Sequence, residues 1–328
     1  MNIDTAQPDT VPTDTMPADT VQPDIVRAAA FLARHGRLLD RRRFAAVTGG
    51  GTADAETRRA VLAALEGYRN ADGGYGWGIE PDLRAPESQP AGALHALQAI
   101  ADAGPETAGS APRLLDWLAR VTLDDGGLPF ALPLADPVGC APFWTAADSG
   151  ASSLQITAAV AAQAHRAARF DPRINEHPWP ARATRYCFDA IASIHEVPFA
   201  YVLSFALRFL DAAADTHPEA LELLAHLGRF VPGDGAVPVT GGAEGETLHL
   251  LDYAPTPGRP VRALLDDEAV ARDLDRLANG QQADGGWAVD FDSYSEAAKL
   301  EWRGYATVSA VSILLANGRV PSGTAVAR

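Results

Sequence analysis

Apolar residues recur at helical spacing along most of the chain, and stretches rich in glycine, proline and polar residues separate the apolar segments. Spacings of three and four residues place apolar side chains on one face of a helix, so each segment predicts an amphipathic helix. We expect helices over residues 25–39, 55–68, 90–103, 112–122, 150–169, 180–194, 198–213, 218–230 and 267–278, and a last helix from residue 302 onward. The pattern predicts an all-α fold.

The last two predicted helices differ in how far their apolar surface extends. Residues 267–278 carry an amphipathic pattern, whereas the helix from Trp302 onward is covered by apolar residues such as Ala306, Val308 and Ile313. A helix that is apolar all round is buried on both sides. The pair therefore predicts an outer helix, a tight turn and a buried inner helix.

A glycine-rich turn recurs between the predicted helices. Its copies are Asp72-Gly73-Gly74, Asp125-Gly126-Gly127, Asp234-Gly235 and Asp284-Gly285-Gly286. Glycine accepts the positive φ angles that such turns need. The aspartates lie 53, 109 and 50 residues apart, and 109 is close to two periods of about 54 residues. One copy near residues 173–180 has therefore lost its glycines, and the repeated units must stack or close on one another to bury their faces.

The last copy resembles a known motif. Gln281, Asp284, the two glycines and Trp287 form Q-x-x-D-G-G-W, which is similar to the glutamine–tryptophan repeat of squalene–hopene cyclases. That terpene cyclase and protein prenyltransferase superfamily implies a single-domain α/α toroid of about five to six helix pairs over residues 25–328. In such toroids the residues that start inner helices face a central cavity, so functional residues are expected there.

Composition and charge limit the partners and the cellular location that can be expected for the chain. Residues 1–24 repeat aspartate, threonine and proline and are expected to be a disordered tail. The net charge of −15 argues against nucleic acid or an anionic membrane as a partner. Neither a transmembrane run nor a signal peptide is expected, and Cys140 and Cys187 give no disulfide or metal-ligand spacing. Cytoplasmic localisation is the resulting prediction, and the alanine and arginine bias indicates a GC-rich bacterial genome.

Carboxylates near the turns are the candidate catalytic residues: Glu87, Asp290, Asp292 and Glu301. The turns precede inner helices, so we expect these four side chains to converge on one cavity. An arginine partner lowers a carboxyl pKa, which disfavours a proton donor. Sequence distance from the arginines therefore favours Asp290 or Asp292 as the acid, with Glu301 and Arg303 as a structural pair.

Aromatic and cationic residues supply the candidate substrate contacts. We expect aromatic walls from Trp77, Trp144, Trp302 and Tyr253, and cationic contacts from Arg84 and Arg303. Aromatic faces stabilise carbocations without quenching them. The alternative for Arg84 is a loop-pinning ion pair with Asp82 or Glu87.

The resemblance implies acid-initiated, class II cyclisation of a small hydrophobic isoprenoid. The D-x-D-D acid motif is missing, since Asp290-Phe291-Asp292-Ser293 supplies only D-x-D. The D-D-x-x-D metal motif and the prenyltransferase zinc ligands are missing too, so neither a metal nor another cofactor is expected. Mg²⁺ would matter only for a diphosphate substrate, held by Arg84, Arg259 or Arg303. A glycosidase with paired carboxylates and a non-catalytic toroid that binds a partner remain alternatives.

Overall fold

The computed structural model describes residues 22–106 and 108–320. The predicted disordered tail, residues 1–24, lies outside this part except for its last residues. In chain order the described α-helices are α1 (Ile25–His35), α2 (Leu38–Gly49), α3 (Ala55–Leu65), α4 (Pro90–Ala103), α5 (Ala111–Val121), α6 (Pro142–Thr145), α7 (Leu154–Ala168), α8 (Pro172–Glu176), α9 (Pro178–Ala192), α10 (Ala200–Ala213), α11 (Ala220–Gly228), α12 (Leu250–Tyr253), α13 (Asp267–Asn279) and α14 (Glu296–Ala316).

Helices account for nearly all the regular structure of the described residues. The 3₁₀ helices are η1 (Gly50–Thr52), η2 (Glu66–Tyr68) and η3 (Pro260–Leu264). Within the described ranges, the strands β1 (Val237–Pro238) and β2 (Thr247–Leu248) form a single short antiparallel pair. The all-α prediction is confirmed.

Capping chemistry explains why several helix boundaries match the prediction. Asp24 caps α1, where its side chain accepts a hydrogen bond of 3.0 Å from the backbone N–H of Arg27. α4 begins at Pro90, whose fixed φ suits a first helical turn, and ends before Gly104 at a φ of 66°. The proline and the glycine can both be recognised in the sequence, so the predicted and observed ends of α4 coincide.

Helix α2 is the clearest departure from the sequence prediction. The predicted helix 25–39 ends early, at His35, because the backbone of Gly36 turns to an extended conformation with φ −74° and ψ 148°. A second helix then follows where a loop was expected. The run of arginines in α2 interrupts the apolar pattern, so the sequence does not show which face of the helix is buried. Asp40 and Arg43 lie on that face and are nearly fully enclosed. These two residues pair with Arg37 and Asp102 respectively, which allows charged groups to occupy a buried helix face.

Helix α14 begins earlier than expected. Ser295 caps it by accepting a hydrogen bond of 3.0 Å from the N–H of Ala298, so the helix starts at Glu296 rather than near Trp302. The polar first turns carry no apolar stripe, which is why the pattern missed them. Glu301 consequently lies in the second turn of the helix and not at its start.

The repeated turns share one geometry. In the turns of Asp72, Asp125 and Asp284, the aspartate carboxylate accepts a hydrogen bond from the N–H two residues later, at 2.9, 3.0 and 3.1 Å. The first glycine of each turn has a φ of 95–98°. The loop of Asp234 makes the same aspartate contact at 3.1 Å. The repeat in the sequence is therefore a repeat of backbone conformation.

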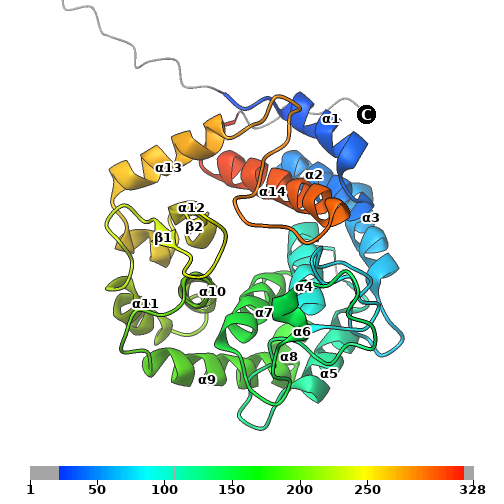
Figure 1. The fold of residues 1–328 in the computed structure, drawn as a ribbon, viewed down its shortest axis with the longest axis vertical. Helices are drawn as coiled ribbons and strands as arrows, with labels where there is room; N and C mark the ends of the chain where they lie inside the picture. The colour runs from blue at the N-terminus through cyan, green and yellow to red at the C-terminus, as the bar shows by residue number, and fades with distance from the viewer. Residues whose placement is uncertain (1–21, 107, 321–328) are drawn as a thin grey trace, which may run out of the picture.

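Each of the three double-glycine turns packs against the outer helix that follows it around the molecule. Arg120 of α5 donates to the carbonyl of Asp72, and Arg182 of α9 donates to the carbonyl of Leu123. The last turn receives the first helix instead, because Arg27 of α1 hydrogen bonds with the carbonyl of Ala283. The N-terminal helix thus takes the place that a further repeat would occupy (Figure 1).

Two sets of helices differ in position. In Figure 1, α14, α2, α4, α7 and α10 lie nearer the centre of the view, and α1, α3, α5, α9, α11 and α13 lie around them. α4 packs on α7 and α7 packs on α10, while α2 packs against both α4 and α14. Alanine is frequent in α4 and α7, and most of these alanines are buried. Small side chains allow these helix backbones to lie close together.

Candidate functional site

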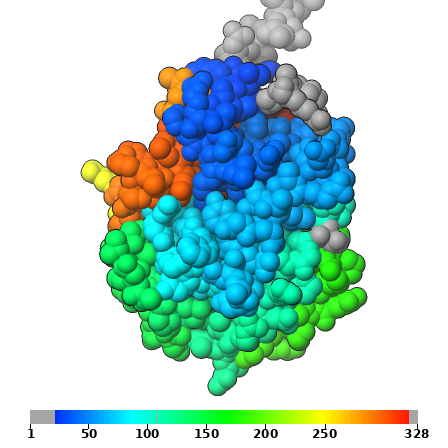
Figure 2. Space-filling model, turned by 90° about the vertical axis from the view of Figure 1, so that its right-hand side faces the viewer, coloured from blue at the N-terminus to red at the C-terminus, as the bar shows by residue number. Residues whose placement is uncertain are grey.

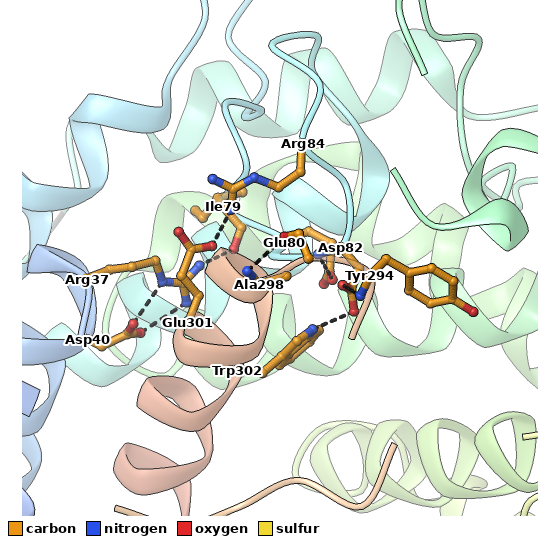
Figure 3. A network of polar contacts seen from close by, with 11 residues as sticks. Arg37, Asp40, Ile79, Glu80, Asp82, Arg84, Tyr294, Ala298, Glu301 and Trp302 are labelled. Carbon is orange, nitrogen blue, oxygen red and sulfur yellow. Dashed lines mark hydrogen bonds and ion pairs between the residues drawn. The ribbon is translucent and has the colours of Figure 1, made fainter. Parts of the chain in front are cut away.

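Asp82 lies in the loop between the first glycine turn and α4 and is only 3% exposed. The indole N–H of Trp302 donates to its Oδ2 at 2.6 Å, and the backbone N–H of Tyr294 donates to its Oδ1 at 3.1 Å (Figure 3). Burial raises the pKa of Asp82, and these two hydrogen bonds oppose that rise in part. A buried carboxyl with a raised pKa is suited to the role of a general acid.

Three loops from distant parts of the chain meet over Asp82. The carbonyl of Asp82 accepts a hydrogen bond of 2.8 Å from the N–H of Ala141, which precedes α6. Phe143 of α6 packs edge-on against Tyr294, with ring centroids 5.8 Å apart. Figure 2 shows these cyan, green and orange segments meeting along one edge of the molecule. Asp82 is thus enclosed by these loops together with Trp302 of α14.

Aromatic residues of α14, of α4 and of the loop before α14 form a cluster beside the carboxyl of Asp82. The Trp302 ring lies 5.1 Å from Phe291, 5.5 Å from Tyr305 and 6.1 Å from His95, measured between ring centroids. His95 and Tyr305 are themselves 5.4 Å apart. Trp302 and Tyr305 are only half-buried although they lie on an inner helix. The cluster places aromatic surface next to a potential proton donor, and such surface attracts cations.

A second carboxylate supports the loop of Asp82. Glu80 contacts His95 at 2.7 Å between Oε2 and Nε2, and both side chains are buried. Its Oε1 accepts a hydrogen bond of 3.2 Å from the backbone N–H of Asp82. The negative charge of Glu80 contributes to the raised pKa of Asp82. Glu80 therefore fixes the loop on α4, and its charge adds to the rise in the pKa of Asp82.

The four carboxylates expected from the sequence lie in different surroundings. Asp290 and Asp292 are exposed, and Asp290 Oδ2 lies 3.9 Å from Nε2 of His249. Glu301 pairs with Arg84 (Figure 3). Glu87 lies in a surface cavity of about 530 Å³ beside Trp117, where its Oε2 is buried without a hydrogen-bond partner. Only Glu301 adjoins the network around Asp82.

The arginines form other pairs than those expected. The expected Glu301–Arg303 pair is wrong, because Arg303 instead binds both carboxylate oxygens of Asp284, at 2.8 and 2.9 Å. Arg84, for which Asp82 or Glu87 was the alternative partner, pairs with Glu301. Arg303 pairs with Asp284, the aspartate of the glycine turn in the same repeat. Arg84 of the first glycine-rich unit pairs with Glu301 of the last unit.

Arg259, the remaining arginine considered for a diphosphate, is also paired. Its Nε contacts Asp211 at 3.0 Å and its Nη1 contacts Asp215 at 2.6 Å. None of the arginines Arg84, Arg259 and Arg303 therefore presents a guanidinium without a carboxylate partner in the described structure.

Among the expected aromatic contacts, only Trp302 adjoins Asp82. Trp77 is 60% exposed and donates its indole N–H to Asn70 at 2.7 Å. Trp144 is buried and stacks on Phe130 at 4.5 Å between centroids. Tyr253 is buried and donates to the carbonyl oxygen of Gly235 at 2.7 Å, and burial raises its pKa. These three residues stabilise separate loops.

Asp82, Glu80 and His95 were not among the catalytic residues expected from the sequence. Asp82 and Glu80 belong to the densest polar loop of the chain, so their location carried a signal. The sequence contains no signal of their burial, because that burial depends on loops that follow 50 and more residues later. A lone histidine within an alanine-rich helix likewise gives no sign of its partner.

Residues 22–106 and 108–320 contain neither a cluster of metal ligands nor a membrane-spanning helix. No group of three or more His, Cys, Asp or Glu side chains in these ranges is arranged to hold a metal ion. No helix in the same ranges combines the length and apolar character needed to cross a membrane. Neither the models of known protein families nor the curated proteins compared with the chain give a match.

Proposed function

We propose that the chain is an isoprenoid cyclase of the acid-initiated, class II type, built as an α/α toroid. Four outer–inner pairs that pack on each other support the toroid: α1 with α2, α3 with α4, α9 with α10, and α13 with α14. The packing of α1 on the last glycine turn supports closure of the ring. The Q-x-x-D-G-G-W motif of that turn is the sequence feature that agrees with this assignment.

The observation that carries the proposed chemistry is the buried Asp82 beside the aromatic cluster. In the proposed first step the O–H bond of the Asp82 carboxyl breaks and a C–H bond forms on an alkene carbon of the substrate. The carbocation that results migrates against the faces of Trp302, Tyr305 and Phe291. Loss of a proton from the final cation to a base or water gives the product, and water returns a proton to Asp82.

Asp82 replaces Asp290 and Asp292 as the proposed donor. A strong acid must carry its proton at the working pH, which burial and a neighbouring carboxylate favour. Asp82 has both features, whereas the other two aspartates are exposed to solvent. Glu301 is unsuited because its carboxylate is held in an ion pair with Arg84.

The glycosidase alternative receives less support. It needs two carboxylates across an open groove, separated by roughly 5–10 Å. Of the four acids expected from the sequence, Glu301 is neutralised by Arg84, while Asp290 and Asp292 lie on one exposed loop. They do not form the opposed pair that this chemistry requires.

Turnover of linear prenyl substrates tests the proposal. The purified chain and its variants Asp82→Asn, Asp290→Asn and Asp292→Asn are incubated with a panel of such substrates, and cyclic products are measured by gas chromatography. We expect Asp82→Asn to lower the rate about 100-fold or more, the size of a general-acid contribution. The Asp290 and Asp292 variants serve as matched controls and should stay within about twofold of wild type.

Two outcomes would count against the proposal. A wild-type chain that cyclises none of the substrates refutes the cyclase function. A folded Asp82→Asn variant that retains the full rate refutes the assignment of the donor and leaves the reaction class intact.

A further inference from the structure

A surface cavity of about 530 Å³ opens between the first glycine-rich unit, the outer helix α5 and the loop that follows α5. Its walls include the apolar side chains of Trp117 and Leu132, and its charged groups are the carboxylates of Asp72 and Glu87. None of the described residues that line it is an arginine, a lysine or a histidine, and none belongs to the network around Asp82. A cavity of this size suits a small-molecule ligand.

The two carboxylates keep acceptor oxygens to which the described residues bring no donor. Glu87 accepts a hydrogen bond of 3.2 Å at Oε1 from the backbone N–H of Ala135, whereas its Oε2 is buried and has no hydrogen-bond partner among these residues. The terminal torsion of a glutamate is soft, so this oxygen can turn toward the cavity. Asp72 uses Oδ1 to accept from the N–H of Gly74 and the hydroxyl of Ser88, at 2.9 and 2.8 Å. Because a buried carboxylate oxygen without a donor is costly, the lining favours a ligand that brings donors and positive charge.

The neighbouring polar groups are occupied with one another and leave these carboxylates charged. The Nδ2 of Asn70 donates to a backbone carbonyl and to a serine hydroxyl, at 2.8 and 3.0 Å, and its Oδ1 accepts from the indole N–H of Trp77 at 2.7 Å. Arg120 of α5 contacts the turn through the backbone carbonyl of Asp72, at 2.5 Å, and not through its carboxylate. The negative charge of the lining is therefore available to a ligand.

Trp77 adjoins the cavity through Asn70 and has an unusual backbone conformation. Its φ is 59°, and within the described ranges it is the only residue other than glycine with a positive φ. Its side chain is 60% exposed, so its ring adds little to the core. A bulky residue in the left-handed region is strained, and strain of this kind is typical of ligand-binding segments. The strained backbone and the hydrogen bond to Asn70 hold an aromatic ring in solvent at the edge of the cavity.

We propose that this cavity binds a small organic ammonium ion that carries a hydrocarbon chain. The ammonium N–H groups bond to the carboxylates of Glu87 and Asp72, and such charge-assisted hydrogen bonds are stronger than neutral ones. The hydrocarbon chain packs on Trp117 and Leu132, and the exposed ring of Trp77 offers an aromatic face, which attracts cations. The net charge of −15 favours the approach of a cation. The site does not depend on the proposed reaction, because it lies in a different cavity and concerns binding alone.

Calorimetric titration with n-hexylamine at neutral pH and fixed low ionic strength tests this site, because a primary amine is protonated under these conditions. Hexanol and hexanoate have the same chain length without the positive charge and are titrated in parallel. The wild-type chain should bind one hexylammonium ion and should bind the other two compounds about tenfold or more weakly. Glu87→Gln should weaken hexylammonium binding by about tenfold. Glu222→Gln is the matched control, because it removes the same charge from an exposed side chain of α11, and it should bind like wild type.

Trp77→Gly keeps the test usable if Glu87→Gln folds poorly. Glycine accepts a φ of 59°, so this variant removes the ring without adding backbone strain, and it should weaken hexylammonium binding about threefold or more. Circular dichroism checks that each variant is folded. No hexylammonium binding by wild type, equal binding by folded Glu87→Gln, an equal loss in Glu222→Gln, or equally strong binding of hexanol would overturn the proposal. Unchanged binding by folded Trp77→Gly would overturn the part assigned to that ring.

Discussion

The first and last glycine-rich units share a turn but lead into loops of opposite burial. Both turns close with a bridge between residues six apart, Arg69 with Tyr75 and Gln281 with Trp287. After the first turn Asp82 is 3% exposed, whereas after the last turn the side chain of Asp290 is 51% exposed. The last loop covers the first, through the hydrogen bond from Tyr294 to Asp82. The repeat thus fixes backbone conformation, and contacts between units decide which acids are buried.

Alanine substitution at the turn glycines should give the largest effect on stability. A Cβ at Gly285 would lie 2.2 Å from the carbonyl oxygen of Arg27, and one at Gly73 would lie 2.7 Å from that of Arg113. Both positions also have positive φ. Gly285→Ala should therefore lower the free energy of unfolding by about 3–5 kcal/mol, from left-handed strain and overpacking together, and Gly73→Ala by somewhat less. Urea denaturation measures both.

Gly241→Ala is the control for these variants. Gly241 has a φ of 80°, but a Cβ placed there would meet no atom within 4 Å, so only the conformational strain of about 1–2 kcal/mol applies. If Gly285→Ala cost no more than Gly241→Ala, the close contact between the last turn and α1 would be wrong.

The sequence allowed prediction of features set by local chemistry. The ends of α4 follow from Pro90 and Gly104, and the turns follow from their Asp-Gly-Gly pattern. Helix α2 was missed because buried ion pairs, such as Arg43 with Asp102, replace its apolar stripe. Both partners are needed to see that pairing, and they lie 59 residues apart.

The candidate site was predictable only to the level of its loop. Asp82 stands beside other acids in the sequence, and its burial comes from segments around Ala141, Tyr294 and Trp302. Each of those contacts joins units that are distant in the chain, so the repeat pattern carries no information about them. Asp290 and Asp292 follow the last glycine turn, so they were expected to face the same cavity as the acid that follows the first turn. Both are exposed, so the loops after the two turns differ in burial.

Removing an indole N–H should have an intermediate effect on the free energy of unfolding, and the effect should be larger for Trp302 of the last unit than for Trp77 of the first. Trp302→Phe loses the hydrogen bond of 2.6 Å to buried Asp82 and should cost about 1–3 kcal/mol of unfolding free energy, because it leaves a buried acceptor without its partner. Trp77→Phe loses the bond to Asn70 at an exposed side chain and should cost no more than about 0.5 kcal/mol. Equal losses in urea denaturation would mean that Asp82 is not held by Trp302.

The smallest expected effect is a pH dependence that distinguishes the two aspartates. Burial raises the pKa of Asp82 in the folded chain, so above the unfolded value of about 3.9 the folded state retains a proton that the unfolded state releases. By linkage, the stability contributed by this protonation is greatest at low pH and is lost as pH rises through the folded pKa. Asp82→Asn cannot titrate, so its stability relative to wild type should increase between pH 4 and pH 7.5. Asp292→Asn, at an exposed position with no ion pair among the described residues, should keep a constant difference in stability from wild type in the same urea series. A constant or decreasing difference for Asp82→Asn would show that Asp82 ionises at least as readily in the folded chain as in the unfolded one, and the assignment of Asp82 as the acid would then fail.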